Sequence, residues 1–166
     1  MTDLVVAHLN ATGVPYEIVA CDPDLADTAE FCQAYGYELA DSANTIIVVG
    51  KSDPKVFAAC VVLADSRLDV NGVVRKRFGT RKASFASGDQ TSELTGMVIG
   101  GVTAAGLPAD LPLWIDSRVM AREQIVLGGG GRDRKIVGPP TLLAALPNAE
   151  VVEGLAKVAP RPPDGV

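Results

Sequence analysis

The sequence is poor in the side chains on which most hydrolases rely. It contains a single histidine, His8, inside an expected N-terminal helix, so a Ser-His-Asp or Cys-His arrangement would have to recruit that one residue. We interpret His8 as a partly buried helix residue, the commoner role of a lone histidine. The same shortage leaves too few ligands for a His/Cys metal centre, and we expect neither a metal nor a cofactor.

Cysteine and long apolar runs are scarce as well. Cys21, Cys32 and Cys60 are odd in number and show no C-x-x-C spacing, which argues against a disulfide framework and favours a reduced compartment. No basic segment precedes an apolar stretch, and no window approaches the roughly 20 apolar residues of a membrane span. We therefore expect a soluble, cytoplasmic protein that has no membrane partner.

Nucleotide-binding loops are missing. The chain has no G-x-x-x-x-G-K-[ST] segment, and its glycine runs do not lead from a strand into a helix as a dinucleotide fingerprint requires. These absences argue against NTP hydrolysis and hydride transfer. What remains is chemistry that uses backbone amides, since a run such as Gly128 to Gly131 can present several N–H groups to a developing oxyanion. A flexible hairpin is the alternative interpretation of this run.

Basic residues are absent from the first 50 positions, where eight acids give a local balance of −8. Because the whole chain has a formal net charge of −5, the remainder carries +3. Five basic residues of that remainder form one cluster, which consists of Arg75, Lys76, Arg77, Arg81 and Lys82. Three more, Arg132, Arg134 and Lys135, follow the glycine loop. The cluster could meet a nucleic-acid backbone, although a solvated helix end is the commoner explanation of such charges.

Length and periodicity favour one domain over residues 1–158, with a disordered proline-rich tail at 159–166. Capping residues and apolar spacing predict helices over 2–13, 27–35, 69–79, 90–94, 117–121 and 139–146. Thr2 caps the first, Asp27 with Glu30 resembles a capping box at the start of the second, and Gly36 ends the second. A β-branched run at 45–49, a turn at 51–54 and a return run at 56–63 predict a hairpin buried on both faces. Further strands are expected at 14–20, 97–99, 113–116 and 135–137, which together give a mixed sheet.

The second half of the chain carries an ordered series of short motifs. Thr95-Gly96 precedes the Gly100-Gly101-Val102 turn, the run Leu113 to Asp116 ends in Ile-Asp, and the four-glycine loop follows. This order resembles the YbaK/EbsC family, whose members are freestanding editing domains that hydrolyse mischarged aminoacyl-tRNA. The likeness extends more loosely from about Asn10 to Leu146. It implies an α+β fold in which a curved mixed sheet closes toward a barrel, with helices packed outside.

The resemblance also implies where a site would lie. The family commonly places a lysine before a Thr or Ser at the start of the central strand, and this chain has Asn44-Thr45 there. Asparagine can orient an ester carbonyl through neutral hydrogen bonds, but it cannot supply the field of an ammonium. Lys51 is no simple replacement, because seven extended residues separate it from Asn44 by on the order of 23 Å.

Other family positions are partly kept. Gly100, Gly101 and Val102 match the turn that shapes the amino-acid pocket, whereas Ala104 stands at the family's proline. The resemblance places Asp116 at the pocket rim, while an N-cap of the 117–121 helix is an equally good explanation. A Ser and an Asp found in some members around the last glycine loop are replaced here by Gly128 and Lys135.

Two hypotheses follow from these patterns. In the first, the protein deacylates a tRNA mischarged with a small amino acid, acting in trans. Asn44 and Thr45 then orient the substrate, Gly129 and Gly130 hold the carbonyl oxygen, and the cluster from Arg75 to Lys82 binds the acceptor end of the tRNA. In the second, the chain is a catalytically weak module that binds an amino acid, an aminoacyl-tRNA or a partner protein. Homo-oligomerisation stays open in both.

Overall fold

A long antiparallel hairpin organises the fold. In the computed structural model, which describes residues 3–98 and 100–158, β2 (Ala43–Gly50) pairs along its whole length with β3 (Val56–Leu63). Ile47 and Val61 point into one hydrophobic cluster, whereas Val48 and Cys60 point into another on the opposite face of the sheet. Because both faces are covered, the two strands are almost uniformly apolar, and the predicted doubly buried hairpin is confirmed.

The strands form three sheets. The largest has the order β5-β2-β3-β6-β9, in which β3 and β6, and likewise β6 and β9, run parallel. Its other strands are β5 (Ala83–Phe85), β6 (Leu113–Asp116) and β9 (Ala149–Val152). A second sheet has the order β1-β8-β7, and a third pairs β10 with β4. Their bounds are β1 (Glu17–Ala20), β4 (Ser66–Leu68), β7 (Ile125–Gly128), β8 (Arg134–Gly138) and β10 (Ala156–Val158).

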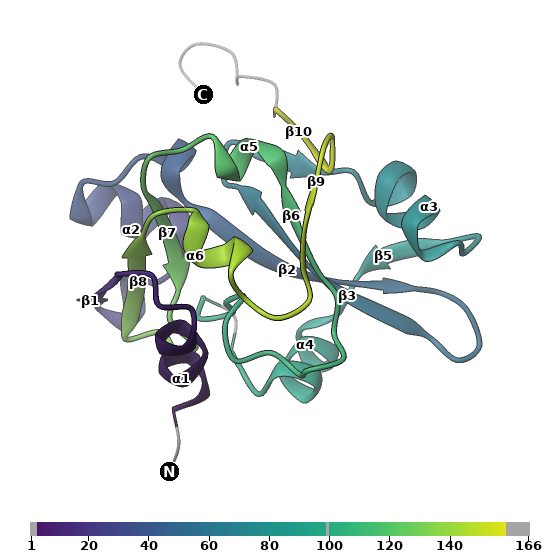
Figure 1. The fold of residues 1–166 in the computed structure, drawn as a ribbon, viewed down its shortest axis with the longest axis horizontal. Helices are drawn as coiled ribbons and strands as arrows, with labels where there is room; N and C mark the ends of the chain where they lie inside the picture. Colours follow the sequence, from purple (N-terminus) through teal and green to yellow (C-terminus); the bar gives the residue numbers. More distant parts are fainter. Residues whose placement is uncertain (1–2, 99, 159–166) are drawn as a thin grey trace.

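The expected closure toward a barrel is wrong. Within the described ranges the two larger sheets are linked by one isolated parallel bridge, between Ser42 of the segment before β2 and Val126 of β7. A single bridge cannot continue a ladder around a barrel wall, because closure requires continuous pairing at a fixed stagger. The three-stranded sheet therefore stands beside the start of β2, while the hairpin projects away from it (Figure 1).

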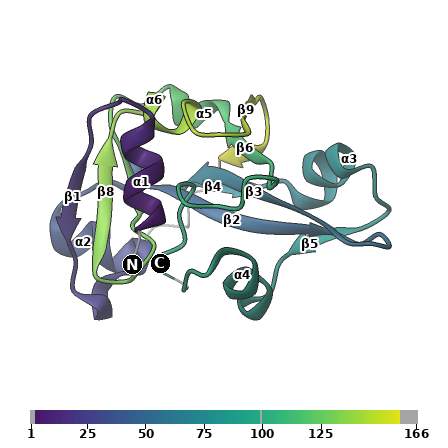
Figure 2. The same cartoon turned by 60° about the horizontal axis from the view of Figure 1, so that its bottom comes forward.

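The helices lie around these sheets. They are α1 (Leu4–Ala11), α2 (Thr28–Tyr35), α3 (Arg75–Phe78), α4 (Gly88–Thr95), α5 (Ser117–Met120) and α6 (Thr141–Ala144). Short 3-10 turns occupy Pro23–Leu25 and Leu39–Asp41, and a π-turn at Val70–Val74 leads into α3. In the turned view α1 lies alongside β8, and α4 lies below β2 (Figure 2). The described part of the chain has no helix long and apolar enough to cross a membrane.

Local capping explains several helix ends. The expected Thr2 cap lies outside the described residues, and the Asp3 carboxylate instead accepts a hydrogen bond from the Val6 amide at 3.3 Å. Gly36 ends α2 at a φ of 78°, as predicted from its position after the helix. The expected capping box at Asp27 is wrong, because that side chain makes no cap hydrogen bond. A capping box forms at Ser87 and Gln90 instead and starts α4.

Candidate functional site

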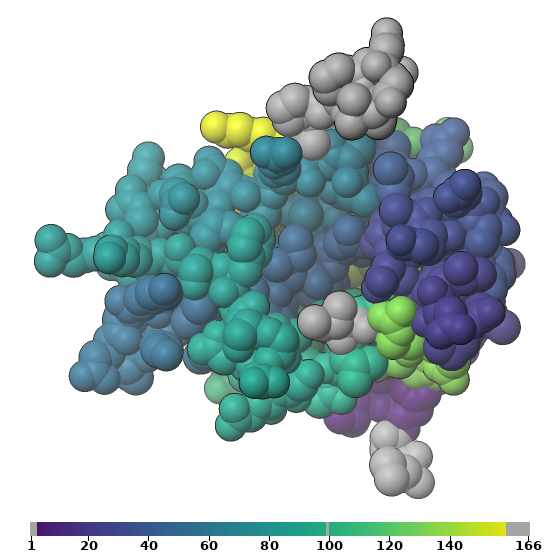
Figure 3. Space-filling view, turned by 180° about the vertical axis from the view of Figure 1, so that it is seen from behind, coloured from purple at the N-terminus to yellow at the C-terminus, as the bar shows by residue number. Residues whose placement is uncertain are grey.

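The main candidate site is a cavity of about 360 Å³ on one side of β2. It lies between the start of α2, the middle of β2, the start of α4, the 100–102 turn and the adjoining ends of β7 and β8. Figure 3 shows this face, where blue atoms of β2 are visible between the purple-blue segment around α2 and the teal atoms around α4. The lining residues are Ala26, Asp27, Thr28, Asn44, Thr45, Ile46, Ile47, Ala86, Gly88, Thr91, Gly100, Val102, Gly128 and Lys135.

The middle of β2 gives the cavity an open strand edge. On the side away from β3, β5 pairs only with Val48 to Gly50, and the bridge to β7 lies at Ser42. Residues 44–46 therefore have no ladder partner on that side within the described strands. The Thr45 hydroxyl is buried at this edge without a hydrogen-bond partner in the described residues. An unpaired buried hydroxyl costs free energy, and a polar ligand at this edge would supply the missing partner.

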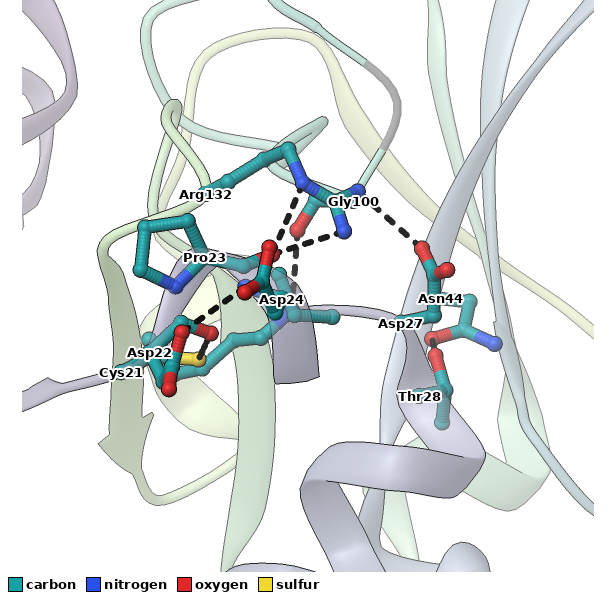
Figure 4. Close-up of polar contacts among 11 residues, drawn as sticks. Cys21, Asp22, Pro23, Asp24, Asp27, Thr28, Asn44, Gly100 and Arg132 are labelled. Carbon is teal, nitrogen blue, oxygen red and sulfur yellow. Dashed lines mark hydrogen bonds and ion pairs between the residues drawn. The ribbon is translucent and has the colours of Figure 1, made fainter.

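Asn44 is oriented by the neighbouring helix. Its side-chain carbonyl Oδ1 accepts a hydrogen bond from the Thr28 hydroxyl at 3.0 Å, at the first residue of α2 (Figure 4). No described residue accepts a hydrogen bond from the Asn44 amide NH2 group, and Asn44 is only half-buried. The two N–H donors of that group are thus free to bind an acceptor in the cavity.

Lys135 is the main feature of the site that sequence reasoning left unassigned. Its side chain reaches the cavity from β8 and is only 6% exposed. The ammonium Nζ donates to the carbonyl oxygens of Ala26 at 2.6 Å and Gly100 at 2.9 Å, and it lies 5.5 Å from the centre of the Phe31 ring. Burial lowers the pKa of this lysine. The available indication was a cation directly before Ile136 and Val137, in the strand expected at 135–137.

A second cation closes the outer side of the site. Arg132 pairs with the Asp27 carboxylate at 3.1 Å and donates from Nε and Nη2 to the Pro23 carbonyl at 3.1 and 2.8 Å. In Figure 4 its guanidinium lies against Gly100. A Cβ at Gly100 would overlap that guanidinium, and the backbone there has a φ of 90°, so the position requires glycine.

The two glycine segments pack against each other. The Gly130 amide donates to the Gly101 carbonyl at 2.6 Å, and a Cβ on Gly101 would lie 2.7 Å from the Gly131 carbonyl carbon. A Cβ on Gly128 would overlap the Val102 carbonyl oxygen, and the Gly129 carbonyl accepts a hydrogen bond from Arg134 at 2.8 Å. Gly128 lines the cavity, whereas Gly129 and Gly130 do not. The glycine loop therefore packs against the 100–102 turn that lines the cavity. The Gly130 amide, which was expected to bind the substrate carbonyl, already donates to the Gly101 carbonyl.

Asp116 lies away from the cavity, at the end of β6. It is fully buried beside Leu155 and Ala156, and neither carboxylate oxygen meets a hydrogen-bond partner of good geometry in the described part of the chain. Burial raises the pKa of this carboxyl, and the nearby backbone amides of Ala156 and Ser117 only partly oppose that shift. Asp116 occupies the N-cap position of α5 but makes no side-chain cap bond.

The basic cluster also lies away from the cavity, on α3 and the turn that follows it, and none of its five members lines the site. Arg77 forms an ion pair with Glu150 and stacks over the Trp114 ring at 4.9 Å. Lys76, Arg81 and Lys82 are exposed. The Lys82 carbonyl accepts from the Lys51 amide at 2.9 Å, which places this turn beside the tip of the β2–β3 hairpin.

No group of three His, Cys, Asp or Glu side chains within 3–98 and 100–158 is arranged to hold a metal ion. Ala104, at the position where a proline was expected by resemblance, is buried in the main hydrophobic core at 3% exposure.

Comparison with known proteins identifies related domains. Residues 22–146 match the model of the aminoacyl-tRNA editing domain family, a span that contains every lining residue of the cavity. A candidate trans-editing enzyme for prolyl tRNA synthetase is 25% identical, with a TM-score of 0.76 over 90% of this chain and 92% of that one. The hypothetical protein APE2540 is 23% identical, with a TM-score of 0.82 over 93% and 100% of the two chains, and shares the fold.

Proposed function

The chain belongs to the aminoacyl-tRNA editing domain family. We propose that it acts in trans on a mischarged tRNA and hydrolyses the ester bond that joins a small amino acid to that tRNA. The observation that carries this proposal is the Asn44 amide, held by Thr28 with its NH2 group unpaired at a cavity of about 360 Å³. That volume lies near the lower end of ligand sites, which favours a small acyl group.

The lining residues suggest how the ester would be cleaved. Asn44 donates to the ester carbonyl oxygen, Thr45 offers its unpaired hydroxyl, and Gly100 to Val102 form the wall beside the amino-acid side chain. The described lining includes no histidine or cysteine, and its one carboxylate, Asp27, is paired with Arg132. Water is therefore the nucleophile, because attack by the neighbouring ribose hydroxyl would only move the acyl group to another ribose oxygen and leave an ester. The water oxygen bonds to the acyl carbon, the ester C–O bond breaks, and the departing ribose oxygen takes up the proton that the water loses.

The same chemistry supports a second candidate. A cavity whose lining offers no free carboxylate and no histidine has no evident general base. The domain would then bind an amino acid or an aminoacyl-tRNA and cleave it slowly or not at all. Binding without turnover is the outcome that favours this candidate.

Deacylation kinetics on a panel of tRNAs, each mischarged with a small amino acid, test the proposal. We expect Asn44→Ala to lower kcat/KM by roughly tenfold to a hundredfold, the scale of one polar contact in the transition state. Asn71→Ala is the matched control, because Asn71 is exposed in the turn before α3 and lies outside the cavity lining. Equal rates for wild type and Asn44→Ala would remove Asn44 from the reaction.

A further inference from the structure

Lys135 carries a buried positive charge and has no role among those assigned above to Asn44, Thr45 and the 100–102 turn. Its Nζ contacts two neutral backbone carbonyls, those of Ala26 and Gly100, and forms no ion pair within the described residues. Removing an ammonium from water is expensive unless a negative partner compensates, and a carbonyl supplies only a partial charge. A buried, incompletely compensated cation at a cavity is a frequent mark of a functional site.

The geometry leaves Lys135 with one donor to spare. An ammonium has three N–H bonds, and the Ala26 and Gly100 carbonyls use two of them. These two carbonyls belong to different segments of the cavity lining, one before α2 and one in the glycine turn, so they hold Nζ at a fixed place between the two segments. The Phe31 ring centre lies 5.5 Å from Nζ, and the cavity itself borders the side chain.

We infer that Lys135 is the substrate-orienting cation of this site, and that its third N–H binds the ester carbonyl oxygen and stabilises the negative charge formed there during attack. The inference rests on the proposed function. Asn44 reaches the same cavity from β2, so the carbonyl oxygen meets one neutral donor and one charged donor that come from different sheets. Donors fixed before the reaction need no reorganisation when the charge develops, which is why they accelerate the step.

A purely structural role predicts different behaviour. If Lys135 only ties Ala26 to Gly100, its loss loosens both walls, and a positive charge elsewhere in the cavity does not help. If its charge acts on the substrate, an ammonium supplied from another lining position restores part of the rate. A lysine at position 44 can supply that ammonium, because Asn44 lines the same cavity from β2.

The test therefore compares wild type, Lys135→Met, Lys135→Arg and the double variant Asn44→Lys with Lys135→Met. We measure kcat/KM on mischarged tRNA, melting temperature, and the Kd of an amide-linked 3′-aminoacylamino adenosine, which cannot be hydrolysed. We expect Lys135→Met to lose roughly a hundredfold to a thousandfold in kcat/KM, the usual effect of removing one oxyanion donor. The double variant should recover at least about tenfold over Lys135→Met. Lys135→Arg should keep intermediate activity, because it retains the charge without the compact geometry.

Wild-type enzyme supplies an independent readout if Lys135→Met fails to fold. Burial lowers the pKa of Lys135, so kcat/KM should fall with rising pH earlier than an exposed lysine would allow, after spontaneous ester hydrolysis is subtracted. Wild-type rates in Lys135→Met, a double variant no faster than Lys135→Met, or a flat alkaline profile would each overturn the inference. An inactive wild type that still binds the analogue more tightly than Lys135→Met overturns the proposed reaction alone. Equal binding by both proteins overturns this inference as well.

Discussion

Lys135 and Asp116 are both buried charged side chains, yet the regions around them differ. Lys135 is 6% exposed, donates to two carbonyls and lines the cavity. Asp116 is fully buried and does not line that cavity. Its carboxylate has no well-formed hydrogen bond in the described part of the chain. Burial disfavours the charged form of both groups. Only the first is held in place by hydrogen bonds beside a space that a ligand can fill.

The difference shows that burial of charge alone does not identify a functional residue. Asp116 follows Ile115 at the end of a strand and lies beside Leu155 and Ala156, where burial disfavours its charged form and raises its pKa. Lys135 has polar partners in two different segments that line the cavity. A functional assignment therefore needs the neighbours as well as the exposure.

Apart from changes at Lys135 itself, the largest expected effect comes from Gly128, which lines the cavity beside the 100–102 turn. In Gly128→Ala the new Cβ would overlap the Val102 carbonyl, so we expect a loss of about 1–3 kcal/mol in the free energy of unfolding. Displacement of the 100–102 turn should also lower kcat/KM on the order of a hundredfold. Urea denaturation and kcat/KM per folded molecule measure the two effects.

Gly154→Ala is the matched control in the opposite region. That residue has a φ of 71° but no neighbour within 4 Å of a new Cβ, so the change should cost about 1–2 kcal/mol through backbone strain and leave turnover unchanged. Normal turnover in folded Gly128→Ala would mean that the glycine wall does not shape the site, and the contrast between the two regions would weaken.

A smaller effect concerns the exposed cations near the hairpin tip. If the tRNA acceptor stem lies along the basic cluster, Arg81→Glu with Lys82→Glu should weaken tRNA binding and reduce the salt slope of log K by roughly 0.7–0.9 for each lost phosphate contact. Arg77 is left unchanged, because it pairs with Glu150 and covers Trp114. Binding titrations at several salt concentrations provide the measurement.

The control is Arg67→Glu with Lys157→Glu, two exposed cations that face each other across β4 and β10. Equal losses in both double variants would indicate a general charge effect, and an unchanged slope in Arg81→Glu with Lys82→Glu would remove this surface from the docking model. Hydrolysis of a small aminoacyl ester should survive both changes, since none of the four residues lines the cavity.

The smallest effect on activity is expected at Asp116. The raised pKa means that the folded protein keeps this proton more tightly than the unfolded chain, so stability falls as pH rises from the unfolded pKa through the raised folded pKa. Asp116→Asn removes the titration and should be more stable than wild type above that interval, while kcat/KM stays within about twofold. Thermal unfolding at about pH 4 and about pH 8 measures the difference. A large loss of activity would place Asp116 in the site and erase the contrast with Lys135.

The hairpin and most helices were predictable because their evidence is local. The β-branched run before the turn at 51–54, and Gly36 after α2, constrain the backbone within a few residues. The strands β4, β5, β9 and β10 were missed, since each is short and partly exposed. They gain their order by pairing, β4 with β10, β5 with β2 and β9 with β6. Met97 and Val98 were expected in a strand and lie in none, because that apolar segment has no strand beside it.

The sequence by itself determined the family, the α+β class, and the places where glycine must stand. It also indicated Asn44, Thr45 and the 100–102 turn, which all prove to border one cavity. Only the tertiary structure decided that Lys135 joins them, that Gly130 uses its amide to hold Gly101, and that Asp116 lies elsewhere. Capping, turns and periodicity act between near neighbours, whereas Lys135 meets Ala26 and Gly100 across 109 and 35 positions. Contacts between such distant positions depend on how the sheets pack, and a single sequence does not encode that packing locally.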